Sequence, residues 1–264
     1  MLAKTNIEQM KLTAKLLLDI EPIRNKEFGW IVHHPIISDS HQVFVNKETN
    51  IPEMVDIFTP EGLEKVKAQY RELIDKVKSA GQFFMIINKP YSGIFFKLTK
   101  DFMNEEDYTM MLRTLWTLME YPNADKNVTK DEWISYWKKV NLELIYDEED
   151  KKVIDGLPDE FYVYRGLMPR AKKNALSWTI DKDKAIWFAK RFEPHGKVYR
   201  AKAKKKDILV YLSDRMESEI VIDYRKLKGV EDPDDAFDRL VMYIKRGNHI
   251  LISGGTATGK TTFL

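Results

Sequence analysis

The stretch FYVYRG at residues 161–166 decides the fold of this chain together with four pieces that follow it. These are LSWTI at 176–180, KVYRAKA at 197–203, DILVYL at 207–212 and EIVID at 219–223. Each piece is short and rich in β-branched and aromatic residues, which predicts a strand. Helical spacing interrupts the series once, over residues 182–191. Residues 161–223 are therefore expected to form a strand-rich unit with one helix.

The preceding residues alternate between helical and extended patterns. Apolar spacing predicts helices over residues 9–18, 61–81 and 105–120, and another that the capping-box pair Thr129 and Glu132 opens. Two short strands are predicted over 29–37 and 41–46, and a hairpin over 82–98 with its turn at 89–93. Three tryptophans, at positions 116, 133 and 137, fall on apolar helix faces and are expected in the core.

These patterns predict an α+β chain with three parts. A mixed α and β unit occupies residues 1–100, a second domain occupies residues 101–228, and residues 229–264 form a tail entered through a linker at 229–235. The first unit is a candidate for target recognition.

Composition narrows the class of protein. The chain has 264 residues, is 44% hydrophobic and 32% charged, and contains no cysteine. Disulfides, zinc ribbons and thiol catalysis are thereby excluded. No apolar run is long enough for a membrane span, and the N-terminus is charged and helix-patterned rather than a signal peptide. We expect a cytoplasmic protein with no membrane partner.

Three features of the strand-rich segment suggest a chemical site. Arg165 ends a predicted strand before Gly166, where the backbone can turn and a ligand approach, and a guanidinium grips a diphosphate well. Ser177 lies on the next strand. Glu217 and Glu219 are spaced i and i+2, so in an extended segment both carboxylates point to one side. Carboxylates can stabilise an oxocarbenium-like transition state when a glycosidic bond breaks. Each feature alone is also common on ordinary protein surfaces.

The ordered string YRG, LSWTIDKDKAIWFAKRF, GKVYRAKAKKKDILVYL and RMESEIVID resembles the arginine-serine-glutamate class of ADP-ribosyltransferases. The match is clear over residues 161–223. A wider stretch, 83–223, looks like a group of phage-associated and bacterial proteins. The resemblance implies a split-sheet α+β domain that binds NAD as co-substrate in a cleft between two small sheets.

The resemblance also implies roles for individual residues. Arg165, with Gly166, would contact the NAD phosphate or ribose, and Ser177 would brace the site. Glu219 would bind the nicotinamide ribose and favour loss of nicotinamide, while Glu217 would orient or deprotonate the acceptor. The family's serine-threonine-serine is here Ser177-Trp178-Thr179. Trp178 either packs inward, which we favour, or stacks on nicotinamide.

The implied activity is mono-ADP-ribosylation of a macromolecule by a toxin, an anti-phage defence effector or a phage-borne modifier. Its partners would be a protein or nucleic-acid acceptor and an antitoxin or inhibitor protein. Positive charge gathers between residues 168 and 206, where cations mixed with Tyr199, Trp187 and Phe192 would suit nucleic acid. A solvated basic face is the simpler interpretation of that charge.

Two further motifs call for an interpretation. His33, His34 and His41 cluster in sequence, but adjacent histidines on a strand point to opposite faces and no acid completes a set, so we expect no metal.

Residues 254–261 satisfy the phosphate-loop pattern and resemble type IV secretion ATPases, with Gly254, Gly259, Lys260 and Thr261 as candidate ATP and Mg²⁺ ligands. Too few residues follow to build the helix that holds the phosphates. We interpret this segment as a fragment of a longer fused or truncated product, or as a tail packed on the main domain. The alternative function is a nucleotide-binding ATPase piece with an accessory domain.

Overall fold

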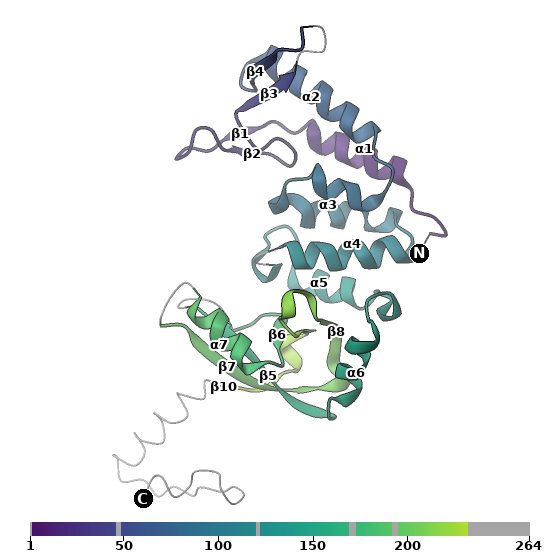
Figure 1. Cartoon of the computed structure of the whole chain (residues 1–264), viewed down its shortest axis with the longest axis vertical. Helices are drawn as coiled ribbons and strands as arrows, with labels where there is room; N and C mark the ends of the chain where they lie inside the picture. Colours follow the sequence, from purple (N-terminus) through teal and green to yellow (C-terminus); the bar gives the residue numbers. More distant parts are fainter. Residues whose placement is uncertain (1, 46–48, 120–121, 169–172, 192–194, 232–264) are drawn as a thin grey trace, which may run out of the picture. The chain divides into compact units, whose positions relative to one another are not determined.

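The computed structural model describes residues 2–45, 49–119, 122–168, 173–191 and 195–231 (Figure 1). The chain is mixed α and β and divides into two compact units, residues 1–151 and residues 152–264. The boundary predicted at residues 100/101 falls inside the first unit, because the helix that follows it packs against the helices that precede it.

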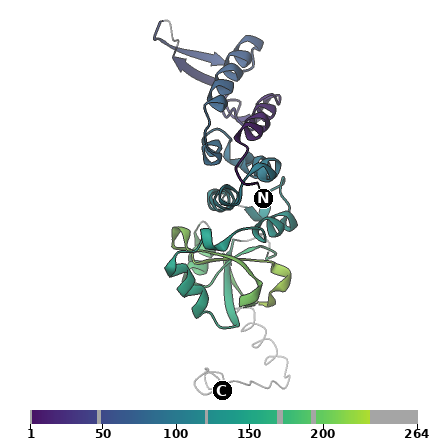
Figure 2. The ribbon, with the colours of Figure 1, turned by 90° about the vertical axis from the view of Figure 1, so that its right-hand side faces the viewer.

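The first unit is mainly helical (Figure 1). Its longer helices are α1 (Ile7–Leu18), α2 (Pro60–Asp75), α3 (Ser92–Thr99), α4 (Glu105–Leu118) and α5 (Lys130–Trp137). Short helices are η1 (Ala80–Met85), η2 (Lys89–Tyr91), η3 (Lys100–Phe102), η4 (Pro122–Ala124) and η5 (Leu142–Leu144), and α6 (Glu148–Gly156) crosses into the second unit. Two antiparallel pairs complete it: β1 (Ile23–Arg24) with β2 (Val32–His33), and β3 (His41–Val45) with β4 (Pro52–Asp56). Figure 2 shows β3 and β4 as a ribbon beside α2.

Local sequence explains where these helices begin. The side chains of Asn6, Thr59 and Asn104 each accept a backbone N–H of the first helical turn that follows. The capping box predicted for α5 is confirmed, since Thr129 Oγ1 accepts from the Glu132 N–H at 3.2 Å and Glu132 Oε2 accepts from the Thr129 N–H at 2.8 Å.

A tryptophan cluster forms the core of this unit. The Trp116 ring meets those of Trp133 and Trp137 edge-on, with 5.6 Å between ring centroids in both cases. All three side chains are at most 2% exposed. The expectation that these tryptophans are core residues is confirmed.

The predicted hairpin over residues 82–98 is wrong, because the segment is helical through η1, η2 and α3. Phe95 and Phe96 are adjacent and both buried, which a half-buried strand does not allow. Gln82 Oε1 accepts the backbone N–H groups of Lys78 and Ser79 and so holds the start of η1. The helix predicted over 61–81 also ends earlier, at Asp75.

The second unit contains a six-stranded antiparallel sheet in the order β10-β7-β5-β6-β9-β8, with helix α7 (Figure 1). Its elements are β5 (Glu160–Leu167), β6 (Ser177–Thr179), α7 (Lys182–Lys190), β7 (Lys197–Lys204), η6 (Lys205–Asp207), β8 (Ile208–Leu212), η7 (Asp214–Met216), β9 (Glu219–Ile222), η8 (Tyr224–Lys226) and β10 (Lys228–Glu231). All five predicted strands and the single predicted helix are confirmed. The predicted linker at 229–235 begins instead as β10, and its residues from 232 lie outside the described ranges.

The two central strands of this sheet, β5 and β6, are paired at one residue position only. β5 pairs with β7 along its whole length, from Glu160↔Lys204 to Leu167↔Lys197, but pairs with β6 only at Tyr164↔Thr179. The sheet therefore consists of two halves, β10-β7-β5 and β6-β9-β8, that meet at a single residue pair.

Candidate functional site

The junction between the two halves brings together the residues that the sequence singled out. Arg165 follows the junction residue Tyr164 on β5, and Ser177 lies two positions before Thr179 on β6. Glu219, the first residue of β9, is the cross-strand partner of Thr179. The three residues come from three different strands and lie near the point where the sheet is least continuous.

Arg165 connects the halves and keeps a free donor. Its Nη1 donates a hydrogen bond to the backbone carbonyl of Ser177. Its Nε is buried and has no hydrogen-bond partner among the described residues. Burial lowers the pKa of the Arg165 guanidinium to about 10, while the negative charge of Glu219 acts in the opposite direction. The group is therefore a half-buried cation at neutral pH, and its Nε–H has no acceptor among the described residues.

The Ser177-Trp178-Thr179 strand contributes hydrogen bonds to the site through its backbone and through the Thr179 hydroxyl. Trp178 is 2% exposed and its Nε1 donates to the Ala175 carbonyl at 2.9 Å, so it packs inward as favoured from the sequence. Thr179 Oγ1 donates to the Glu217 carbonyl at 2.8 Å and accepts from the Asp181 N–H at 3.0 Å. Thr179 thus ties β6 to the turn that carries the two glutamates.

That turn is strained rather than extended. Arg215, Met216 and Ser218 have φ angles of 57°, 55° and 46°, in the left-handed region that these residue types rarely adopt. Glu217 lies inside the turn, and the strand begins only at Glu219. The expectation that both carboxylates lie in one extended segment is therefore wrong. Glu217 instead pairs with Arg215, with 3.4 Å between Oε1 and Nε.

Gly166 has a packing role. β5 continues through it to Leu167, so the strand does not end at Arg165 as expected from the sequence. A Cβ at Gly166 would lie 1.9 Å from the Ala185 carbonyl oxygen and 2.5 Å from the Ala189 nitrogen, both in α7. The close approach that glycine allows here is that of a helix.

Sequence analysis did not assign Tyr199 and Lys173 to the site that contains Arg165. Tyr199 is the cross-strand partner of Arg165 on β7, so both side chains leave the same face of the strand pair. The Lys173 ammonium lies 4.2 Å from the centroid of the Tyr199 ring. The basic composition of the segment hinted at Lys173, but only the β5–β7 register places Tyr199 beside Arg165.

His34 has a structural role in the first unit. His34 is buried; its Nε2 lies 3.0 Å from the Ile20 carbonyl oxygen, and its Nδ1 accepts the N–H groups of Ile36 and Ile37. His33 and His41 contact Asn25 and Ser40. Within the described ranges, no group of three or more metal-ligating side chains converges.

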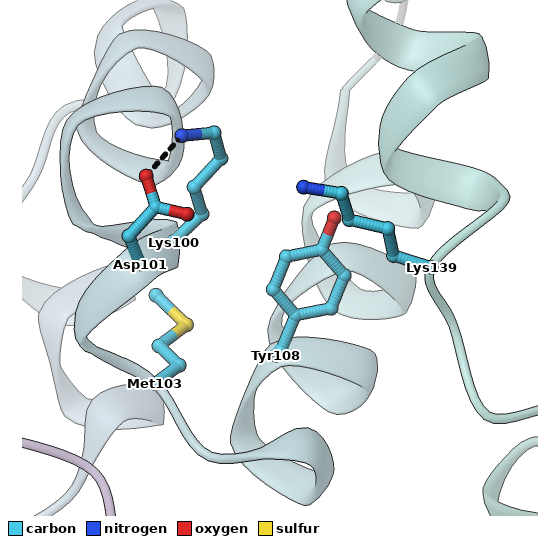
Figure 3. A pocket seen from close by; sticks show the side chains of 5 residues that line it. All are labelled: Lys100, Asp101, Met103, Tyr108 and Lys139. Carbon is cyan, nitrogen blue, oxygen red and sulfur yellow. Dashed lines mark hydrogen bonds and ion pairs between the residues drawn. The ribbon is translucent and has the colours of Figure 1, made fainter. Parts of the chain in front are cut away.

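A separate pocket of about 390 Å³ lies in the first unit, lined by Lys100, Asp101, Met103, Tyr108 and Lys139 (Figure 3). Lys100 and Lys139 face the opening from opposite sides, and the Tyr108 ring stands between them. Lys100 Nζ is paired with Asp101 Oδ2 at 2.6 Å. The Tyr108 hydroxyl donates to the Tyr136 carbonyl at 3.1 Å. The lining therefore combines two lysines and one aspartate with the Met103 and Tyr108 side chains.

Two sets of predicted residues cannot be placed. The phosphate-loop residues Gly254, Gly259, Lys260 and Thr261, and also Phe192, lie outside the described residues. In the part of the chain that the structure describes, no helix has the length and apolar character needed to span a membrane. Comparisons with protein-family models, with curated proteins and with solved structures found no match to this chain.

Proposed function

We propose that the chain is an NAD-dependent mono-ADP-ribosyltransferase that acts on a macromolecular acceptor. One observation carries the proposal: the half-buried Arg165 guanidinium donates to the Ser177 carbonyl, is affected by the charge of Glu219, and has a buried Nε without a partner among the described residues. A buried N–H of a cation suits a phosphate or ribose oxygen. The single junction between the sheet halves accords with the split-sheet fold that the sequence resemblance implies.

Each residue then has a defined part in the reaction. Arg165 holds the pyrophosphate or ribose of NAD. The bond between ribose C1′ and the nicotinamide nitrogen breaks, and the bonding electrons leave with nicotinamide, which departs neutral. The Glu219 carboxylate stabilises the positive charge that develops on the ribose and accepts a hydrogen bond from a ribose hydroxyl.

Glu217 serves the acceptor. A nucleophile of the acceptor forms the new bond to C1′ and gives its proton to the Glu217 carboxylate. The position of Glu217 in a strained turn supports this role, because strained backbone concentrates at functional sites. Its ion pair with Arg215 must open or shift for this step. The resemblance adds the setting: a toxin, an anti-phage effector or a phage-borne modifier in the cytoplasm, with an antitoxin or inhibitor as partner.

The test measures nicotinamide release and label transfer from NAD in lysate. Glu219→Gln should lower nicotinamide release by about 100- to 1000-fold, as expected for loss of a charge aimed at the transition state. Glu160→Gln is the matched control, because this strand glutamate makes only a 3.5 Å surface pair with Lys204. Glu217→Gln should retain nicotinamide release and lose transfer. If Glu219→Gln and Glu160→Gln release nicotinamide at the wild-type rate, or if the wild type releases none, the proposal fails.

A further inference from the structure

One face of the half-sheet β10-β7-β5 carries positive charge and tyrosine. Cross-strand partners project from the same face of an antiparallel sheet. The register pairs Tyr162 with Lys202 and Lys202 with Lys228, and the neighbouring row pairs Tyr164 with Arg200. We call this set the basic sheet face; its members are Tyr162, Tyr164, Arg200, Lys202, Lys204 and Lys228. The same register places two acids on this face, Glu160 opposite Lys204 and Glu231 opposite Arg200.

The basic sheet face is open in the described part of the second unit. Tyr162 is 42% exposed, and Lys202 and Lys228 are exposed as well. The alternate residues of the same strands are buried, with Val163 and Ala201 at 0% and Ala203 at 1%. The hydrophobic core therefore lies behind the strands, and the basic side chains extend away from it.

Two of its cations have no acidic partner among the described residues. Arg200 is held by Glu231, and Lys204 lies 3.5 Å from Glu160. Lys202 and Lys228 form no such pair within the described ranges, although they stand directly opposite each other. Like charges in that position destabilise a sheet. An anion that lies over both lysines would remove this repulsion.

Tyr162 makes the face more than a charged surface. The Arg200 guanidinium carbon lies 4.7 Å, and the Lys202 ammonium 5.7 Å, from the centroid of its ring. Both cations lie over the ring, and the Tyr162 residue is still 42% exposed. This arrangement matches single-stranded nucleic acid, where bases stack on aromatic side chains and on arginine guanidinium planes, and phosphates pair with lysine and arginine. A flexible acidic peptide such as polyglutamate would use the charges but offers no base to stack on the ring.

The sheet register connects this face to Glu219, whereas Arg165 belongs to the alternate row with Tyr199. Arg200 pairs with Tyr164, Tyr164 with Thr179, and Thr179 with Glu219. We propose that the basic sheet face binds single-stranded nucleic acid, RNA or DNA, and that this strand is the acceptor presented at Glu219. That the bound strand is the acceptor rests on the proposed transferase function, whereas the binding itself does not.

Binding is tested without NAD, in the full chain carrying Glu219→Gln so that no transfer occurs. Fluorescein-labelled single-stranded RNA and DNA of mixed sequence are titrated at several salt concentrations, beside duplex DNA and a labelled polyglutamate peptide. The double variant Lys202→Gln/Lys228→Gln should weaken single-strand binding about 25-fold at about 0.1 M salt and reduce the salt slope by about 1.4, since each lost phosphate contact contributes about 0.7. Its control, Lys126→Gln/Lys138→Gln, removes two exposed lysines of the first unit and should bind as the parent does.

Tyr162→Leu separates nucleic acid from an acidic protein. It should weaken binding of the single strand about tenfold without changing the salt slope, because stacking is lost and charge is kept. The proposal is overturned if neither single strand binds at about 50 mM salt, if both double variants behave alike, or if polyglutamate binds as tightly as RNA and Tyr162→Leu has no effect. Intact RNA or DNA binding by a chain that releases no nicotinamide would refute the transferase and leave the surface in place.

Discussion

Gly166→Ala tests whether the contact between β5 and α7 sets the stability of the second unit. The added Cβ would lie 1.9 Å from the Ala185 carbonyl oxygen, whereas ordinary contacts begin near 3.4 Å. The helix α7 must therefore withdraw by about 1.5 Å, because both nearest obstacles are backbone atoms that cannot rotate away. Overpacking of this kind costs about 3 kcal/mol. In a unit of this size the midpoint of thermal unfolding should fall by about 12–24 °C.

The assay is hydrogen exchange of β5 and α7, followed alongside thermal unfolding. Gly156→Ala is the matched control, because nothing lies within 4 Å of a Cβ at that position in α6. Alanine in a helix should leave stability unchanged or raise it by about 0.4–1 kcal/mol. Equal exchange protection and equal midpoints for the two variants would refute the assignment of Gly166 to helix packing.

Three other predictions concern the first unit. Trp116→Ala should cost about 3–5 kcal/mol in urea unfolding because it empties the tryptophan cluster, whereas Trp30→Ala, at a 61% exposed position, should cost little. Thr129→Ala should cost about 1 kcal/mol in the same measurement by removing the cap of α5, and an unchanged urea midpoint would contradict that role. Burial lowers the pKa of His34 below its ordinary value, so the unfolded chain takes up this proton first as the pH falls. Stability should therefore be fully present above about pH 6.5, decline as the pH drops below it and level out once the folded imidazole also titrates; His34→Gln should lose this dependence, and His33→Gln should keep it.

The strands and the helix of the second unit could be predicted because the strands are short, apolar and separated by clear polar segments. The predicted hairpin at 82–98 failed for a physical reason. Its phenylalanines and isoleucines suit strand and helix equally, and only the burial of both Phe95 and Phe96 decides between them. The side-chain cap from Gln82 was readable in the sequence, since Ser79 precedes it at capping-box spacing.

The candidate site was partly visible in the same way. Arg165, Ser177 and Glu219 were selected from the sequence, and the structure places them at one junction. Tyr199 and Lys173 depend on strand register and on a contact between distant segments, neither of which a local pattern encodes. The turn at Glu217 was misjudged because non-glycine residues with positive φ leave no compositional trace.

The hydrogen bond from Arg165 to the Ser177 carbonyl crosses the point where the two sheet halves meet. The Arg165 side chain is therefore both the proposed ligand contact and a hydrogen-bonded link between the two sheet halves. A ligand that holds the guanidinium in place also stabilises this link. Ligand affinity and the stability of the contact between the two halves are therefore thermodynamically linked. Under the proposed function, NAD should slow amide exchange on both sides of the junction between the sheet halves, in β5 and β6 together. By reciprocity, bound NAD should stabilise the junction by the same free energy by which an intact junction strengthens NAD binding.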